Sequence, residues 1–165
     1  MSTIKKCRKY YDQLLQAQTF EEMTPVALDI IDRMPTGVVQ GCGPITTGGF
    51  GCKTKNIFAI CSVIEHLQRQ GYHVFNQMFF EEHVERIWKA TEISGYPNKL
   101  LEDFYRDIFE TGMIKHMIFI PSWKSSKGSR WEMRQARRLN IPTTILSWKE
   151  FHFALKESRF NLVEN

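Results

Sequence analysis

An apolar run that leads into a Ser/Gly turn and then into a helical pattern is the feature that most restricts the fold of this chain. The apolar run covers residues 117–120, the turn lies at 125–129, and the helical pattern continues to Leu139. A strand that feeds a helix in this way is the repeating unit of a parallel α/β sheet. The first turn of such a helix also attracts anions, because it offers free backbone N–H groups and the positive end of the helix dipole.

Glu132 lies just inside this helix. We expect the helix dipole to keep its carboxylate ionised, which suits a nucleophile or an electrostatic stabiliser. The motif alone leaves a second interpretation open, in which Glu132 is an ordinary first-turn residue and the serines are helix caps.

Strand and helix patterns alternate along most of the chain. Thr24 and Pro25 are typical of an N-cap followed by a first-turn proline, and Ser147 with Glu150 forms a capping box. Strands are predicted at 38–40, 72–75, 117–120 and 143–146, and helices at 4–15, 24–34, 56–70, 81–93, 100–110, 129–139 and after Ser147. The pattern predicts an α/β, flavodoxin-like (Rossmann-like) doubly wound parallel sheet of four to five strands, with an added N-terminal helical pair.

In a flavodoxin-like sheet the strand order 2-1-3-4 places the first and third strands side by side. The glycine-rich loop 41–51 then meets the turn at 126–132 at the carboxyl edge of the sheet. We expect Glu132, Asp107, Ser126 and this loop to line one cleft. Alternatively, the glycines serve only loop flexibility.

Other functional motifs do not fit the sequence. Neither a dinucleotide fingerprint nor a Walker loop matches, because Pro44 and Ile45 follow Gly43, and Cys52 separates Gly51 from Lys53. There is no G-x-S-x-G elbow. The cysteines, Cys7, Cys42, Cys52 and Cys61, form no C-x-x-C pair and have no histidine at metal spacing, so we expect reduced thiols, no metal and no organic cofactor.

Composition is typical of one globular domain. The chain has 165 residues, 42% of them apolar, and a net charge of +4, so a nucleic-acid polymer is not an expected partner. The basic residues around the Ser/Gly turn favour a small phosphate-bearing ligand. Residues 1–11 are charged and no run reaches membrane-spanning length, so we expect a cytoplasmic protein with no membrane contact.

Four segments, taken together, carry a resemblance to a known group of proteins. They are 41–46 after the first strand, Asn76 after the second, 105–107 before the third, and 121–132 after it. In this order they resemble the nucleoside 2-deoxyribosyltransferase-like superfamily, which includes N-glycosidases of nucleoside 5′-monophosphates. The resemblance covers about residues 36–146, and its most specific element is Ser126, Gly128 and Glu132.

The resemblance implies a role for each matching residue. Glu132 would be the nucleophilic or transition-state-stabilising glutamate, and Asp107 the second carboxylate that assists the leaving base or orients the sugar. Ser126, Gly128 and Ser129 would hold the 5′-phosphate, while Gly41, Gly43 and Pro44 would wrap the sugar and phosphate. His116 departs from the pattern, because many members have an acidic residue there, and the loop 41–51 lacks the tyrosine that several members place in the sugar site.

These observations predict an N-glycosidase or glycosyltransferase acting on a nucleotide or (deoxy)nucleoside. They also divide the chain into a helical extension at 1–35, an α/β domain at 36–158 and a tail at 159–165. The alternative is a non-catalytic nucleotide-sensing or protein-interaction module. The resemblance also implies a homo-oligomer, for which Trp88, Trp148, Phe151 and Phe153 supply aromatic surface. The candidates for base stacking are Phe50, Phe79, Trp123 and Trp131.

Overall fold

The computed structural model describes residues 3–91 and 95–163, with side chains described for 8–91 and 95–158. At its centre is an all-parallel sheet in the order β2-β1-β3-β4. The strands are β1 Val38–Cys42, β2 Val74–Phe75, β3 Ile114–Phe119 and β4 Thr143–Ile145. This confirms the predicted flavodoxin-like class and order. The first and third strands pair from Val38↔Ile114 to Cys42↔Phe119, with a shift of register between Val38 and Val39.

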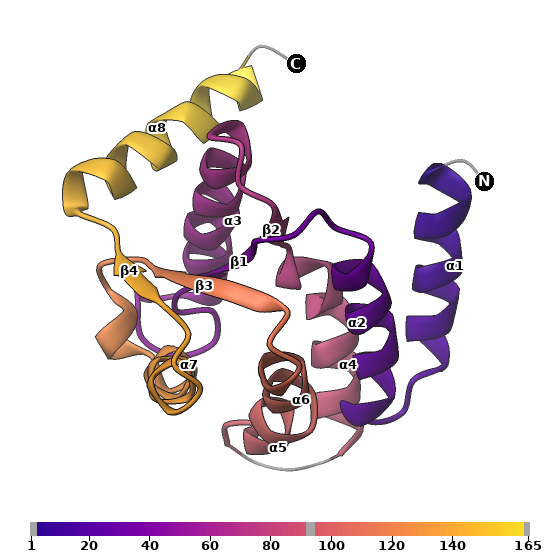
Figure 1. Cartoon of the computed structure of the whole chain (residues 1–165). Helices are drawn as coiled ribbons and strands as arrows, with labels where there is room; N and C mark the ends of the chain where they lie inside the picture. The colour runs from indigo at the N-terminus through magenta and orange to yellow at the C-terminus, as the bar shows by residue number, and fades with distance from the viewer. Residues whose placement is uncertain (1–2, 92–94, 164–165) are drawn as a thin grey trace.

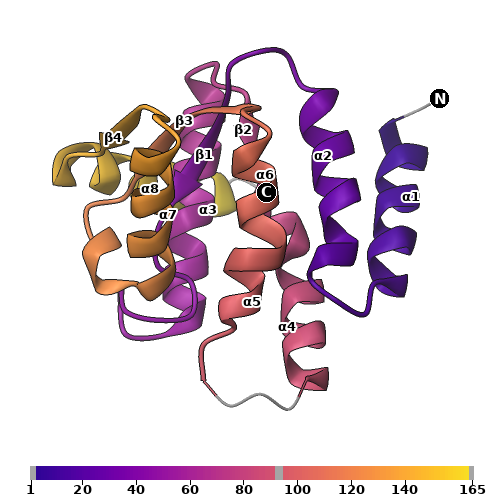
Figure 2. The same ribbon diagram turned by 60° about the horizontal axis from the view of Figure 1, so that its bottom comes forward.

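The helices cover both faces of the sheet (Figures 1 and 2). One face carries α3 and α8, and the other carries the helices between β2 and β4. The helices of the core are α3 Lys53–Arg69, α4 Glu81–Ala90, α5 Asn98–Leu100, α6 Arg106–Glu110, α7 Lys127–Arg138 and α8 Trp148–Val163. None of the helices in the described part of the chain combines the length and the apolar character that crossing a bilayer requires.

The N-terminal pair, α1 Thr3–Gln16 and α2 Thr24–Asp32, lies outside α4 and α6 (Figure 2). Leu14, Met23 and Ile31 are buried in the same apolar cluster as the sheet residues Met117 and Phe119. The extension therefore shares the core of the α/β domain. Thr24 is the first helical residue rather than the N-cap, because Met23 holds the cap position and the Thr24 hydroxyl donates to the Asp103 carbonyl at 3.2 Å.

The structure confirms the predicted start of the last helix and changes the predicted ends of two helices. The Ser147–Glu150 capping box is confirmed: the Glu150 N–H donates to Ser147 Oγ at 3.2 Å, and the Ser147 N–H donates to Glu150 Oε2 at 2.8 Å. Helix α8 continues to Val163, so most of the predicted tail is helical. Helix α4 ends at Ala90, and the predicted last residues of that helix, 92–93, lie outside the described part.

The helix predicted at 100–110 contains a π-helical segment, Leu101–Tyr105, between α5 and α6. A π turn holds one residue more than an α turn and shifts every later side chain around the helix axis. This shift decides which side chains of the segment face the sheet edge.

Candidate functional site

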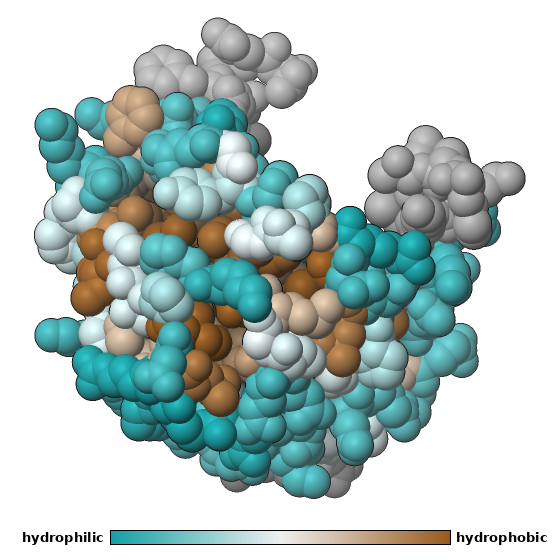
Figure 3. Space-filling model, in the orientation of Figure 1, coloured by the Kyte–Doolittle hydropathy of each residue, from teal (hydrophilic) through white to brown (hydrophobic). Residues whose placement is uncertain are grey.

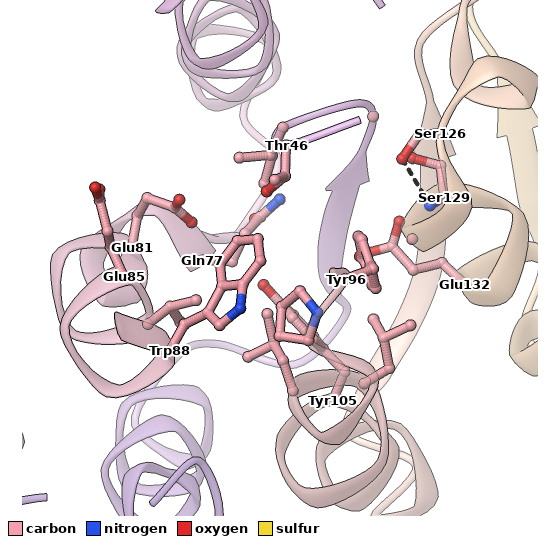
Figure 4. A pocket seen from close by; sticks show the side chains of 17 residues that line it. Thr46, Gln77, Glu81, Glu85, Trp88, Tyr96, Tyr105, Ser126, Ser129 and Glu132 are labelled. Carbon is pink, nitrogen blue, oxygen red and sulfur yellow. Dashed lines mark hydrogen bonds between the residues drawn. The ribbon is translucent and has the colours of Figure 1, made fainter. Parts of the chain in front are cut away.

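A pocket opens at the carboxyl edge of the sheet, where the segments that follow β1, β2 and β3 come together (Figure 4). Gly43 and Thr46 come from the first of these segments, Gln77 from the second, and Ser126 from the third. Helix α4 forms one side and α7 the other. The remaining lining includes Glu81, Glu85, Trp88, Tyr96, Tyr105, Gly128, Ser129 and Glu132.

Glu132 is the buried carboxyl group of this pocket, with 8% of its surface exposed. It lies on α7 above the sheet face that Gln40 and Cys42 of β1 share, because side chains two residues apart in a strand point to the same face. The Gln40 Nε2 group donates to Glu132 Oε1 at 3.1 Å. A buried glutamine in the middle of a parallel strand thus orients the carboxyl group.

Burial raises the pKa of Glu132 to about 7, while the hydrogen bonds from Gln40 and Cys42 lower it by less than burial raises it. The prediction that the helix dipole keeps this group ionised is therefore wrong. Glu132 is the sixth residue of α7, and the dipole acts mainly within the first turn. Removal from water outweighs the dipole at this depth.

The N-terminus of α7 carries a serine cap, as the second interpretation of the motif expected, and the helix begins at Lys127, two residues before the predicted start. Ser126 is the N-cap, and its hydroxyl accepts from the Ser129 N–H at 3.3 Å. The Ser129 hydroxyl is buried and has no hydrogen-bond partner among the described residues. Because Ser129 also lines the pocket, this hydroxyl is an unused donor at the helix end. The Lys127 ammonium lies 5.2 Å from the centre of the Tyr96 ring and adds positive charge there.

Two hydrogen bonds join the loop 41–51 to the serine turn. The Gly49 N–H donates to Ser125 Oγ at 2.8 Å, and the Lys127 N–H donates to Thr47 Oγ1 at 3.2 Å. The buried Asn56 of α3 holds the loop from inside, because its Nδ2 group donates to the carbonyls of Ile45 and Gly48 at 3.1 and 3.0 Å. The predicted meeting of the two loops is confirmed.

The glycines of this loop, and Gly128 of the serine turn, occupy positions that disfavour a side chain. Gly48 and Gly49 have φ of +70° and +71°, a region that disfavours residues with a Cβ. Gly43 packs against Ile120, whose side-chain atoms would lie 2.8 Å from an added Cβ. Gly128 is equally confined, because a Cβ there would collide with the Tyr96 hydroxyl.

Asp107 does not join the other predicted residues. It is exposed on α6 and is not among the residues that line the pocket. Tyr105, two positions earlier, does line it, and helical residues two apart point to different sides. The prediction that Asp107 lies in the cleft is wrong. Gly41 and Pro44 also lie outside the lining, although the Gly41 carbonyl accepts a hydrogen bond from Gln77.

The predicted stacking aromatics also lie elsewhere. Phe50 stacks on Phe151, Trp123 packs against Phe119, and Trp131 packs against Phe109. Phe79 contacts Phe80, and none of the four predicted side chains is among the pocket-lining residues. The aromatic side chains of the pocket are instead Trp88, Tyr96 and Tyr105. Burial, with a smaller contribution from the negative charge of Glu132, raises the pKa of both tyrosines, so their hydroxyls stay protonated.

The α4 side of the pocket carries two carboxylates that the sequence did not indicate. Glu81 and Glu85 lie opposite Ser126, Ser129 and Glu132 (Figure 4). Lys53 of α3 forms ion pairs with both, at 2.8 Å to Glu81 Oε1 and 3.1 Å to Glu85 Oε2. Within the described residues, no group of three or more His, Cys, Asp or Glu side chains converges as metal ligands do.

The free volume between the two sides is small, about 40 Å³. This is space for a few water molecules. Trp88 and Tyr96 also line a neighbouring cavity of about 330 Å³. A ligand larger than a few atoms therefore enters only when these side chains move apart.

In comparisons with known proteins, no family model, no curated protein and no solved structure matches this chain.

Proposed function

We propose that this protein cleaves or transfers the N-glycosidic bond of a nucleotide or deoxynucleoside, with Glu132 acting on the sugar. The observation that carries the proposal is the presence of Glu132, the capped N-terminus of α7 and the Gly43 loop in one pocket. The resemblance of residues 36–146 to nucleoside 2-deoxyribosyltransferase-like proteins points to the same chemistry.

The serine turn supports the binding of a 5′-phosphate. A phosphate there accepts hydrogen bonds from the Gly128 N–H and from the unpartnered Ser129 hydroxyl, since Thr47 and Ser126 already accept from the Lys127 and Ser129 N–H groups. It also lies beside Lys127. This combination of helix end, buried free hydroxyl and ammonium group distinguishes the turn from an ordinary helix cap.

The reaction follows from placing the sugar next to Glu132. Breaking the C–N bond leaves positive charge on the anomeric carbon, and the ionised Glu132 oxygen forms a covalent bond to that carbon. The bonding electrons leave with the base, which takes a proton from a water molecule in the pocket. The hydroxide that remains takes a proton from a second water molecule, or from a second base, which attacks the anomeric carbon, displaces the Glu132 carboxylate and completes hydrolysis or transfer.

Other pocket groups support this chemistry without taking covalent part in it. Gln40 holds the carboxyl oxygen at 3.1 Å. A carboxamide hydrogen-bonds either form of a carboxyl group, because its N–H donates to the carboxylate and its oxygen accepts from the acid. The protonated hydroxyls of Tyr96 and Tyr105 are available to donate to sugar oxygens. In this proposal, residues of the pocket take the role that the resemblance implied for Asp107.

The direct test is incubation of the protein with nucleoside 5′-monophosphates and unphosphorylated nucleosides, in ribo and deoxy forms, followed by chromatographic detection of free base. We expect release from 5′-monophosphates, and incorporation of a second labelled base if the protein is a transferase. Nucleotide binding without any base release would favour a non-catalytic nucleotide-sensing module on the same fold.

A further inference from the structure

The two sides of the pocket differ in hydrogen-bonding character. The α7 side offers donors, namely the Gly128 N–H and the Ser129 hydroxyl, because the neighbouring Lys127 and Ser129 N–H groups already donate to Thr47 and Ser126. The opposite side offers acceptors, through Gln77 and Glu81 (Figure 4). A ligand that satisfies both sides has an anionic group at one end and hydrogen-bond donors at the other.

Gln77 restricts the ligand more strongly than Glu81 does, because its side-chain amide is buried and only one of its two polar groups has a hydrogen-bond partner. It is 4% exposed and begins the short helical turn after β2. Its Nε2 group donates to the Gly41 carbonyl at 2.7 Å. That carbonyl can only accept, which fixes the orientation of the side-chain amide. Gln77 Oε1 then has no donor among the described residues, and a buried acceptor without a partner is costly.

Glu81 adds a second acceptor on the same side. Lys53 holds Glu81 Oε1 at 2.8 Å, and the described residues provide no partner for Oε2. Glu85 differs from Glu81 in this respect, because Lys89 binds its Oε1 at 2.8 Å and Lys53 binds its Oε2 at 3.1 Å. Of the two, only Glu81 therefore has an oxygen that no described residue contacts.

We propose that the pocket selects nucleotides whose base carries an exocyclic amino group, with amino N–H groups donating to Gln77 Oε1 and Glu81 Oε2. This inference rests on the proposed function and specifies its substrate class. A keto base such as uracil or hypoxanthine presents a carbonyl oxygen in place of the amino group. That oxygen opposes two acceptors, and the buried Gln77 oxygen is then paired only if the base shifts to bring its ring N–H into the place of the amino group.

A site built around a substrate N–H group discriminates strongly against an analogue that lacks it. We therefore expect a preference of roughly 100-fold or more for amino over keto bases. The test compares dCMP with dUMP and dAMP with dIMP, by calorimetric binding and by base release. CMP is included beside dCMP, because a ribose 2′-hydroxyl is another donor that could reach Gln77.

Glu81→Gln gives a sharper test, because Lys53 determines how the new amide is oriented. The ammonium attracts the amide oxygen, so the NH2 group turns toward the ligand and the acceptor becomes a donor. We expect the preference for dCMP over dUMP to fall at least tenfold or to reverse. Glu85→Gln is the matched control, and it should leave the preference unchanged because both Glu85 oxygens are already engaged. Thermal unfolding checks that both variants fold.

The outcomes separate the two proposals. Selective binding of dCMP without base release supports the inference and overturns the catalytic function. Equal base release from dCMP and dUMP overturns the inference and leaves the catalytic function standing. A preference for CMP over dCMP, with no distinction between amino and keto bases, also overturns the inference. Absence of binding and release with every nucleotide overturns both.

Discussion

Gln40 Nε2 donates to Glu132 Oε1 at 3.1 Å, joining the middle of the central strand β1 to the second turn of α7. Both side chains are buried, and they lie 92 residues apart in the sequence. The contact requires β1 and β3 to be neighbours, because α7 directly follows β3. The doubly wound topology thus brings a carboxyl group and the amide that orients it to one point of the sheet edge.

Burial of Glu132 should cost the protein stability at neutral and alkaline pH. Its folded-state pKa of about 7 exceeds the ordinary glutamate pKa of 4.5. The folded protein therefore binds the proton more tightly, and the resulting stabilisation is complete below pH 4.5 and is lost as the pH rises through 7. Glu132→Gln removes this loss, so we expect its free energy of unfolding at pH 8 to exceed that of the wild type by up to about 3 kcal/mol.

Denaturant unfolding at pH 4 and pH 8 measures this difference. The acid condition is the control, because Glu132 is neutral there and the two proteins should agree closely. Equal stabilities at pH 8 would contradict the burial cost.

The same pKa predicts the pH dependence of catalysis. Only the ionised form of Glu132 can attack the anomeric carbon, so kcat/KM should rise with pH and level off above about pH 7. A profile with an unphosphorylated deoxynucleoside excludes the phosphate ionisation near pH 6. A kcat/KM that falls through pH 7 would show that Glu132 acts instead as a general acid.

Ser126→Asp should separate phosphate recognition from sugar chemistry. Aspartate is as good an N-cap as serine, so the start of α7 should persist. Its negative charge opposes a 5′-phosphate at the same helix end, and we expect monophosphate affinity to fall at least tenfold while nucleoside affinity stays within about twofold. Calorimetry with one matched nucleotide and nucleoside decides this. An equal loss for both ligands would place the phosphate elsewhere.

Self-association is predicted through the free edge of β4. Among the described strands β4 pairs with β3 alone, and its three residues are exposed. Ile145 and Trp148 are about half exposed, at 51% and 52%, and hydrophobic surface is visible over β4 and the start of α8 (Figure 3). Of the other aromatics considered for an interface, Phe153 is exposed, Phe151 is fully buried and Trp88 lines the pocket.

We expect the β4 edges of two copies to pair, because a bare edge with apolar neighbours is a template for another strand. Light scattering at micromolar concentration should give a dimer for the wild type and a monomer for Ile145→Lys. Tyr72→Lys is the control, since Tyr72 is similarly exposed, at 44%, but lies before β2. A monomeric wild type would exclude this interface.

The fold could be predicted from the sequence because each strand and helix is indicated by residues that are close together in the chain. Apolar runs followed by Gly/Ser turns identified the strands, and the order of elements then determined which loops meet. Glu132, Ser126, Ser129 and Gly43 were found in this way, since each belongs to a segment that directly follows a strand or opens a helix.

The pocket residues that the sequence did not reveal can be recognised only from contacts between segments that are distant in the sequence. Gln40 has a weak signal as a polar residue inside an apolar strand, but its partner is 92 residues away. Tyr96 comes from a connection with no regular pattern. Asp107 was predicted from the family resemblance, and it is exposed on α6, after the π-helical segment. The pKa of Glu132 was misjudged because burial cannot be read from its position in the helix alone.

The central claim is that Glu132 acts on the sugar while the start of α7 holds the phosphate. Its most direct test is Glu132→Ala, assayed for nucleotide binding by calorimetry and for base release by chromatography. We expect base release to fall by roughly 10³-fold or more while binding is retained or tightened, because the substitution removes a transition-state contact and a negative charge near the phosphate. Unchanged base release in Glu132→Ala would contradict the account.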